Sequence, residues 1–288
     1  MKYFFFAFSI IFAVHCKHAE VVESDATNVF FDVEASLSRG VSLEKLEKIA
    51  KGTYLPRKDE AADIKFELRD VLVEHLSDQE DEYQHKSRGR AALRSMREEL
   101  GYPTNKDLKN HFEKGPFDGI KIYTNESKDN SGNQNYQRIN SELRASKDLK
   151  ALQIKNPEIH DWVTQILMSI NKIPVFRGLV FRGSRLSNRF IEQIIKTKSF
   201  QDKAFLSSSL DYSDAVTFAK KPTTAEATKV YMVLYSKTGA FIPFGPFARE
   251  EEVLFKPQTL FKLNYHFYDV SDEGDAFNAY YLFLEEVE

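Results

Sequence analysis

The chain has 288 residues, of which 42% are hydrophobic and 13% aromatic, so it can bury a real core in one large domain or two modest ones. Charges of both signs are interspersed, and the formal net charge is -3. Nucleic-acid-binding domains usually carry a basic patch or stripe, so the composition excludes nucleic acid as the main partner.

The first residues have the pattern of a secretory leader. Met1-Lys2-Tyr3 is a short basic start, and the mostly apolar run 4–14 that follows is too short to span a bilayer. We predict a signal peptide over residues 1–16 and no stable membrane span. Cleavage after Cys16 leaves no cysteine, which indicates a bacterial exporter or a protein that later works in a reducing cytosol. Lipidation of Cys16 and an uncleaved core helix are the alternatives.

Residues 17–112 are predicted to form a helical N-terminal region. The segment is highly charged, and its apolar residues recur at helical spacing, as at Leu43, Leu46 and Ile49. Gly52 with Pro56, and Gly101 with Pro103, separate the short helices. One interpretation is a small lobe that packs on the main domain, and the other is a segment that docks on a membrane, carrier or target.

Residues 113–288 are predicted to form a second domain, of class α+β. Apolar residues after Pro157 predict a helix with one apolar face, at Ile159, Trp162, Val163, Ile166, Leu167 and Ile170. β-branched and aromatic runs then predict strands over 175–181, 230–235, 252–255, 260–267 and 280–284. Strands without regularly intervening helices argue against a doubly wound parallel sheet.

Two arginines are candidates for binding a pyrophosphate. Arg177 and Arg182 each follow an aromatic residue and precede a glycine, five residues apart. A guanidinium meets two phosphate oxygens at once and stays charged when partly buried. An odd offset on one strand points the two side chains to opposite faces, so only one can face a site unless a bulge intervenes. A surface ion pair is the alternative for either.

A run of three serines lies where a strand gives way to a helix. Ser207, Ser208 and Ser209 follow the apolar Phe205-Leu206 and precede Asp211. Their hydroxyls can cap the helix or hold a neighbouring carboxylate.

Three carboxylates, Glu250 to Glu252, run into the apolar strand 253–255. In an extended segment Glu250 and Glu252 point to the same side. Two such carboxylates can divide the work of glycosidic-bond cleavage, because one stabilises the oxocarbenium ion while the other positions the nucleophile. A solvated turn before an edge strand is the alternative.

The order and flanks of these motifs make the chain from about 117 to 288 resemble the secreted mono-ADP-ribosyltransferases of the Arg-Ser-Glu type. The matching residues are Tyr123-Thr124, Tyr136, Ile139-Asn140, Leu143-Arg144, Lys172-Ile173-Pro174, the run 178–183, the run 204–209, and the run 250–255 with Pro257. Ser208 replaces the commoner Thr. The resemblance implies a β-sandwich core of two packed sheets with flanking helices, preceded here by the small helical lobe.

The resemblance also implies roles for single residues. Arg182 would be the family's arginine, with Arg177 the second choice, and Gly183 and Phe205 would join them in binding NAD. Ser207 would hold the catalytic glutamate, Glu252, while Ser209 supports the fold. Glu250 stands where arginine-modifying members have Glu and several asparagine-modifying members have Gln. Phe244 and Phe247 lie in the segment that recognises the target, with packing as the alternative.

The expected activity is therefore transfer of ADP-ribose from NAD to an arginine of a target protein, with NAD as co-substrate and no metal. Actin, a small GTPase and a cell-surface protein are all compatible targets. We expect a monomeric secreted toxin or effector, with a possible translocation partner and a possible site of action inside a target cell.

Three other functions remain open from the sequence. One is an NAD glycohydrolase, which would transfer ADP-ribose to water. The second is a secreted binding module without turnover. A metal-dependent hydrolase is poorly supported, since none of the seven histidines forms a His-x-x-x-His pair.

Overall fold

The computed structural model describes residues 43–57, 60, 64, 87–125, 127–128, 132–220, 227–243, 251–269 and 278–288. The predicted signal peptide, 1–16, lies outside them, as do Glu250, Phe244 and Phe247. Leu43–Glu288 is one compact unit, so the domain boundary expected between residues 112 and 113 falls inside it.

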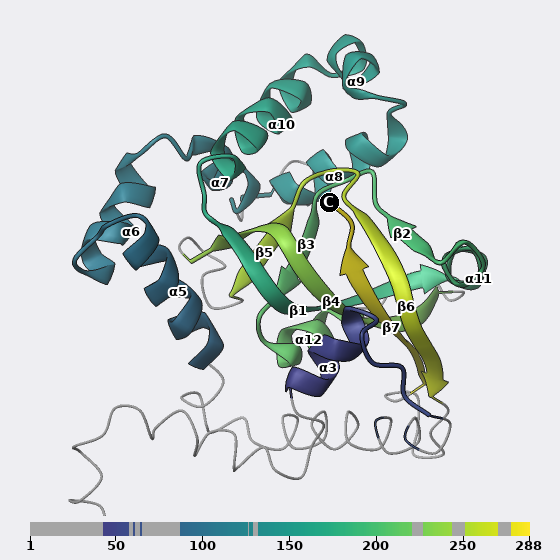
Figure 1. Cartoon of the computed structure of the whole chain (residues 1–288). Coiled ribbons are helices and arrows are strands. Elements are labelled where there is room, and N and C mark those ends of the chain that lie inside the picture. The colour runs from purple at the N-terminus through teal and green to yellow at the C-terminus, as the bar shows by residue number, and fades with distance from the viewer. Residues whose placement is uncertain are drawn as a thin grey trace, which may run out of the picture. The chain divides into compact units, whose positions relative to one another are not determined.

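Among the described residues the helices α3 to α10 precede the first strand, and α11 and α12 lie between strands (Figure 1). The helices are α3 (Leu43–Ala50), α5 (Ser87–Glu99), α6 (Asn105–Lys114), α7 (Asp118–Tyr123), α8 (Asn135–Ala145), α9 (Leu149–Lys155), α10 (Pro157–Ile170), α11 (Asn188–Thr197) and α12 (Tyr212–Lys220). The strands are β1 (Val175–Ser187), β2 (Ser199–Gln201), β3 (Leu206–Ser209), β4 (Ala227–Ile242), β5 (Glu252–Phe255), β6 (Leu260–Asp269) and β7 (Ala279–Glu286). Each predicted strand is confirmed, and β1 and β4 extend beyond their apolar runs.

The helix predicted after Pro157 is α10. The Asn156 side chain accepts a hydrogen bond from the Ile159 N–H, which together with Pro157 in the first turn fixes where the helix begins. Ile159, Val163 and Ile166 are buried on its apolar face. Trp162 packs against the core and carries the guanidinium of Arg138 over its ring, 5.0 Å from the centroid.

The strands form one hydrogen-bonded sheet in the order β1-β3-β5-β4-β7-β6-β2, and β1 also pairs with β4. The predicted α+β class, a sheet core with flanking helices, is confirmed. The two sheets that the resemblance implies are hydrogen-bonded into one, because the long strands β1 and β4 belong to both. β1, β3, β5 and β4 close a ring, and β7, β6 and β2 extend it.

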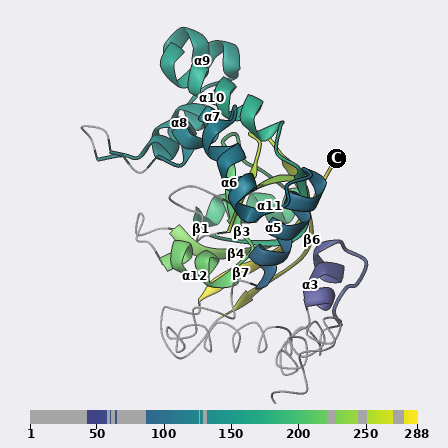
Figure 2. The same cartoon turned by 90° about the vertical axis from the view of Figure 1, so that its left-hand side faces the viewer.

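Helices cover this sheet on several sides. α3 packs against β1, β4, β6 and β7, and α12 packs against β1. α7 to α10 gather at one end, while α5 and α6 lie beside each other at another place (Figures 1 and 2). Met96 of α5 and Leu108 and Phe112 of α6 belong to the same buried cluster as residues of the sheet. α5 and α6 are therefore part of the same core as the sheet.

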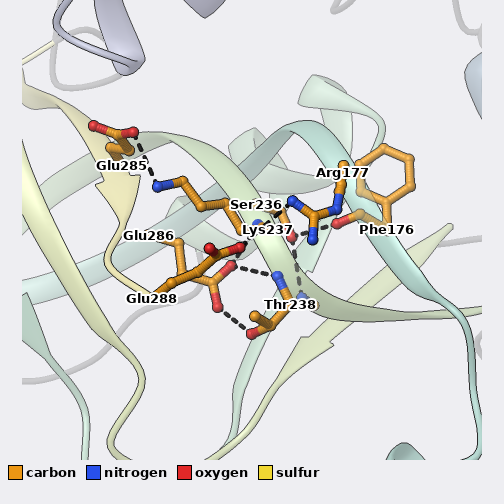
Figure 3. Close-up of polar contacts among 9 residues, drawn as sticks. Phe176, Arg177, Ser236, Lys237, Thr238, Glu285, Glu286 and Glu288 are labelled. Carbon is orange, nitrogen blue, oxygen red and sulfur yellow. Dashed lines mark hydrogen bonds and ion pairs between the residues drawn. The ribbon is translucent and has the colours of Figure 1, made fainter.

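A sharp bend in β4 decides which strand it pairs with. Residues 229–235 pair with β7, whereas 240–242 pair with β5, and the register with β1 shifts in between. The Glu286 carboxylate accepts hydrogen bonds from the N–H groups of Lys237 (2.5 Å) and Thr238 (2.8 Å) and from the Thr238 hydroxyl (Figure 3). Glu286 thereby satisfies the backbone donors that the bend releases from the ladder.

The same irregularity in the pairing of β1 with β4 determines which way the Arg177 side chain points. It lies at the bulge of β1, between Phe176 and Gly178, and its exposed side chain pairs with Glu288 at 3.4 Å (Figure 3). Gly178 has φ +151, a conformation that L side chains rarely adopt, which fits its place beside the bulge.

Within the described part of the chain, no helix combines the length and the apolar character that a membrane crossing needs.

Candidate active site

The three motifs meet where β1, β3 and β5 lie side by side (Figure 1). β1 and β3 share one register pair, Phe181↔Ser209, and β3 pairs with β5 so that Ser209 stands opposite Glu252. Arg182 donates a hydrogen bond from Nη1 to the carbonyl of Ser207. The Ser207 hydroxyl is hydrogen-bonded to the Glu252 side chain. A guanidinium, a hydroxyl and a carboxylate far apart in sequence therefore share one site.

Glu252 is 4% exposed, and this burial is the main influence on the pKa of its carboxyl group. Desolvation raises its pKa above 4.5, while the hydrogen bond from Ser207 and the charge of Arg182 act in the opposite direction without cancelling the shift. Burial likewise lowers the pKa of Arg182, opposed by Asp202, Tyr123 and Glu252. A positive charge that develops beside the Glu252 carboxylate would interact with it at short range, in a medium that screens charges poorly.

A polar bridge from α7 and α8 forms a wall next to this site. The Asn140 side chain donates to the Tyr123 hydroxyl at 3.1 Å and accepts from the Phe205 N–H at 3.1 Å. The Phe205 ring meets the Tyr123 ring edge to face at 5.5 Å and is 1% exposed. Phe205 is thus a buried core residue, and the cofactor-binding role expected for it stays a prediction.

An ion pair lies at the edge of that wall. The Arg144 guanidinium makes two bonds to the Asp202 carboxylate, at 3.0 and 2.8 Å, and Asp202 also accepts from the Ala204 N–H. Sequence reasoning named Asn140 and Arg144 as matching residues and gave them no role. An amide among the apolar residues of a helix was the signal that could have marked Asn140.

A small hollow of about 10 Å³, room for about one water molecule, lies beside Arg182, where β1, β3 and α12 meet. Its lining residues are Phe181, Arg182, Gly183, Ser207, Ser208, Ser209, Ala215 and Phe218. A Cβ at Gly183 would come within 1.6 Å of the Ala215 carbonyl, so the glycine lets α12 approach β1. The packing of α12 is one reason for a glycine after Arg182.

The three serines divide between the site and the helix that follows. Ser208 donates from Oγ to the Val253 carbonyl at 2.9 Å, across the β3–β5 pair. Ser209 donates to Asp214 at 2.8 Å and accepts from the Asp211 N–H at 2.8 Å, at the start of α12. Ser209 thus secures the strand-to-helix turn, which leaves Ser207 to contact Glu252.

The exposed Arg177 side chain pairs with Glu288 and not with the Ser207–Glu252 site, and the cofactor-binding role expected for it stays a prediction. Its pairing with Glu288 results from the bulge, which the sequence analysis recognised only as a possibility. The roles of Glu250, Phe244 and Phe247 lie outside the described residues. No group of residues suited to a metal ion occurs in the part of the chain that the structure describes.

Glu251 is a residue that the sequence analysis missed. It has φ +45, so the backbone is not extended at this residue. The Glu251 carboxyl is 8% exposed and accepts a hydrogen bond from the N–H of Gly89 in α5. The signal in the sequence was the run of three consecutive glutamates. At least one side chain of such a run must point toward the buried face.

The ionisation of Glu251 predicts a pH-dependent stability. Burial, then Asp211 and Asp214, raise its pKa from 4.5 to about 7, while Arg88 and the Gly89 N–H oppose the shift. The contribution of this group to stability is present below about pH 4.5 and is lost as the pH rises through about 7. We expect Glu251→Gln to be more stable than wild type by up to about 3 kcal/mol at about pH 8, and this gain to shrink toward pH 5. Denaturant unfolding at both pH values measures it, and an equal difference at both would contradict the assignment.

Comparison with known proteins adds a sequence relative. No family model matches the chain. The chain is 32% identical over 132 residues to the NAD(+)--protein-arginine ADP-ribosyltransferase Tre1 of Pseudomonas putida (strain GB-1), a match that covers 46% of this chain and 23% of that protein. The chain therefore spans about a quarter of the length of this curated relative.

Solved structures were also compared. The ADP-ribosyltransferase HopU1 of Pseudomonas syringae pv. Tomato DC3000 gives a TM-score of 0.45 at 15% identity, covering 68% of this chain and 87% of that one. The Clostridium limosum C3 exoenzyme gives 0.43 at 18% identity, covering 60% and 85%. The match to Tre1 confirms that this chain resembles the mono-ADP-ribosyltransferases, the family that its three motifs predict.

Proposed function

We propose that the protein is an NAD-dependent mono-ADP-ribosyltransferase that modifies an arginine of a target protein. The observation that carries the proposal is the contact of Arg182 with Ser207 and of Ser207 with Glu252, in a buried site beside a hollow. The named activity of Tre1, to which part of the chain is similar, supports it.

NAD is the substrate, and the residues present fit its charge. A guanidinium carries five N–H donors, so Arg182 can hold the Ser207 carbonyl and still offer donors to pyrophosphate oxygens. The hollow borders Arg182, Gly183 and Ser207, three of the residues proposed to meet NAD. The Arg144–Asp202 pair at the edge is a further polar anchor.

In the proposed reaction the bond between ribose C1′ and the nicotinamide nitrogen breaks, and its electron pair leaves with neutral nicotinamide. The Glu252 carboxylate stabilises the ribosyl cation left behind, held in place by the Ser207 hydroxyl. A guanidinium nitrogen of the target attacks C1′, and Glu250 takes the proton that this nitrogen loses. The products are ADP-ribosyl-arginine, nicotinamide and one proton.

The raised pKa of Glu252 bears on this step. Only the ionised carboxylate can stabilise the cation, so activity should rise with pH through the pKa of Glu252. Arg182 and the positive charge of NAD both favour the ionised form, so bound substrate would lower that pKa.

We also propose that the protein is exported by a leader over residues 1–16 and acts as a toxin or effector on a protein of another cell. The basic start and apolar run support this proposal. Actin, a small GTPase and a cell-surface protein remain the compatible targets, and a translocation partner would be needed for the first two. The intact mass of the exported protein tests the leader, because the mature chain would begin at Lys17.

Labelled NAD added to a cell lysate tests the function. We expect wild type to label protein, and Glu250→Gln to lower this labelling at least about tenfold while it still releases nicotinamide, since water needs no deprotonated guanidinium. Release of nicotinamide by wild type without any labelled protein would indicate an NAD glycohydrolase. If wild type gives neither labelled protein nor free nicotinamide, the proposed enzymatic function is wrong and a binding module is the interpretation that remains.

A further inference from the structure

Arg88, in the first turn of α5, contacts β1 and the residue that follows β3. Its Nη1 donates to the Leu210 carbonyl at 2.8 Å, just after β3, and its Nη2 donates to the Leu179 carbonyl of β1. The guanidinium also lies over the Phe181 ring, 5.4 Å from its centroid. This partly buried side chain comes from a helix far outside the three motifs in sequence.

These bonds close a gap in the sheet. β1 and β3 share the single register pair Phe181↔Ser209. On one side of this pair Arg182 reaches the Ser207 carbonyl, and on the other side Arg88 joins Leu179 to Leu210. The guanidinium groups of Arg182 and Arg88 therefore take the place of backbone hydrogen bonds between β1 and β3 on either side of this pair. Only the first of them belongs to the proposed active site.

The next residue of α5 contacts the third motif. Gly89 donates its N–H to the Glu251 carboxylate, and a Cβ at Gly89 would lie 1.9 Å from Glu251 Oε1. Only a glycine can fit there without displacing that carboxylate. Glu251 also accepts the Leu210 N–H at its carbonyl, 3.1 Å away, and Glu252 follows directly.

The charged groups around Glu251 make the contact between α5 and this carboxyl specific. Arg88, Asp211 and Asp214 are the charged groups that act on Glu251. Burial lowers the pKa of Arg88 to about 10, so it stays charged near neutral pH, and Glu251, Asp211 and Glu47 all favour that charge. Glu251 Oε2 has no hydrogen-bond partner among the residues that the structure describes, so Arg88 and Gly89 are the attractive contacts of this carboxyl there.

We propose that Arg88 and Gly89 are positioning residues, which hold the Glu251 turn and the β1–β3 junction so that Glu252 faces Ser207 and Arg182. The proposal rests on the proposed function. The first turn of α5 takes no part in the bond changes. It acts through backbone carbonyls and Glu251, so its loss should lower kcat and leave NAD binding nearly unchanged, because a catalytic group displaced by about 1 Å can lose about 100-fold in rate.

Gly89→Ala is the sharpest variant, because alanine favours a helix more than glycine does. A purely local role in α5 would therefore leave the protein as stable or more stable and equally active. We expect instead a 10- to 100-fold lower kcat for nicotinamide release, with KM for NAD within about threefold of wild type. Arg88→Gln should act in the same direction. Arg94→Gln, on an exposed position of the same helix, is the matched control and should leave both constants unchanged.

A double-mutant cycle with Glu251→Ala separates positioning from general damage. Truncation of Glu251 removes the atoms that the new Cβ would strike, so Gly89→Ala should have no further effect on kcat in that background. Thermal unfolding of each variant checks that it is folded.

The possible failures can be told apart. If wild type releases no nicotinamide, the proposed function is wrong and the positioning role falls with it. If wild type is active and Gly89→Ala keeps its kcat, or loses it equally with and without Glu251, the positioning role alone is wrong.

Discussion

Replacing Glu252 by Gln is expected to lower kcat for NAD cleavage and for protein labelling by at least about 100-fold, the scale found when a preorganised electrostatic stabiliser is removed. Gln keeps the size of the side chain and an oxygen for the Ser207 hydroxyl, and it removes the charge that the ribosyl cation requires. KM for NAD should change little, since Arg182 and the hollow remain.

The same variant should be at least as stable as wild type near neutral pH. Burial raises the pKa of Glu252 above 4.5, so its contribution to stability is fully present below about pH 4.5 and is lost as the pH rises through the raised value. Gln has no charge to bury and escapes that loss. The advantage of the variant should therefore grow from acid toward neutral pH.

Steady-state kinetics with denaturant unfolding of the same samples measures both effects. Glu192→Gln, an exposed position on α11, is the control and should alter neither. An active Glu252→Gln, or an inactive variant that is also largely unfolded, would contradict the role assigned to this carboxylate.

Replacing Glu286 by Ala is expected to destabilise the protein by about 3 to 5 kcal/mol, since each buried donor left without an acceptor costs about 1 to 3 kcal/mol and the loop relaxes in part. Glu286 is 1% exposed, and its carboxylate accepts from the backbone of Lys237 and Thr238 and from the Thr238 hydroxyl. Alanine leaves these donors without an acceptor, at the bend that directs β4 from β7 to β5.

The adjacent Glu285 provides the matched control. Its carboxylate pairs with the Lys237 side chain at 3.1 Å near the surface, and Glu285→Ala should cost no more than about 1 kcal/mol. Thermal unfolding should show the contrast as a decrease of roughly 10 °C or more for Glu286→Ala against a few degrees for Glu285→Ala. Equal decreases would mean that the bend does not depend on Glu286.

The strands and the apolar helix were predictable because they depend on local patterns. The β-branched and aromatic runs of the strands, and the helical spacing after Pro157, act within one segment. The three motifs were predictable for a related reason, since each is a short run of residue types suited to one chemistry. Their meeting in one site required the resemblance to a known family.

Other features depend on contacts between segments that no local pattern encodes. Glu286 lies in a run of acidic residues that suggests a solvated end of the chain, yet a bend in β4 buries it. Arg177 and Arg182 are near copies in sequence, and only the bulge of β1 sends one to Glu288 and the other to Ser207.

The sequence by itself determined the class of fold, the order of the elements and the candidate residues for cleavage of an N-glycosidic bond, because propensity, periodicity and side-chain chemistry are properties of short segments. The tertiary structure decided which of these residues come together, and it joined α5 to the sheet that the sequence had assigned to a separate domain. The physical reason is burial: a carboxylate such as Glu251 or Glu252 takes its ionisation and its partners from whatever distant segment packs against it.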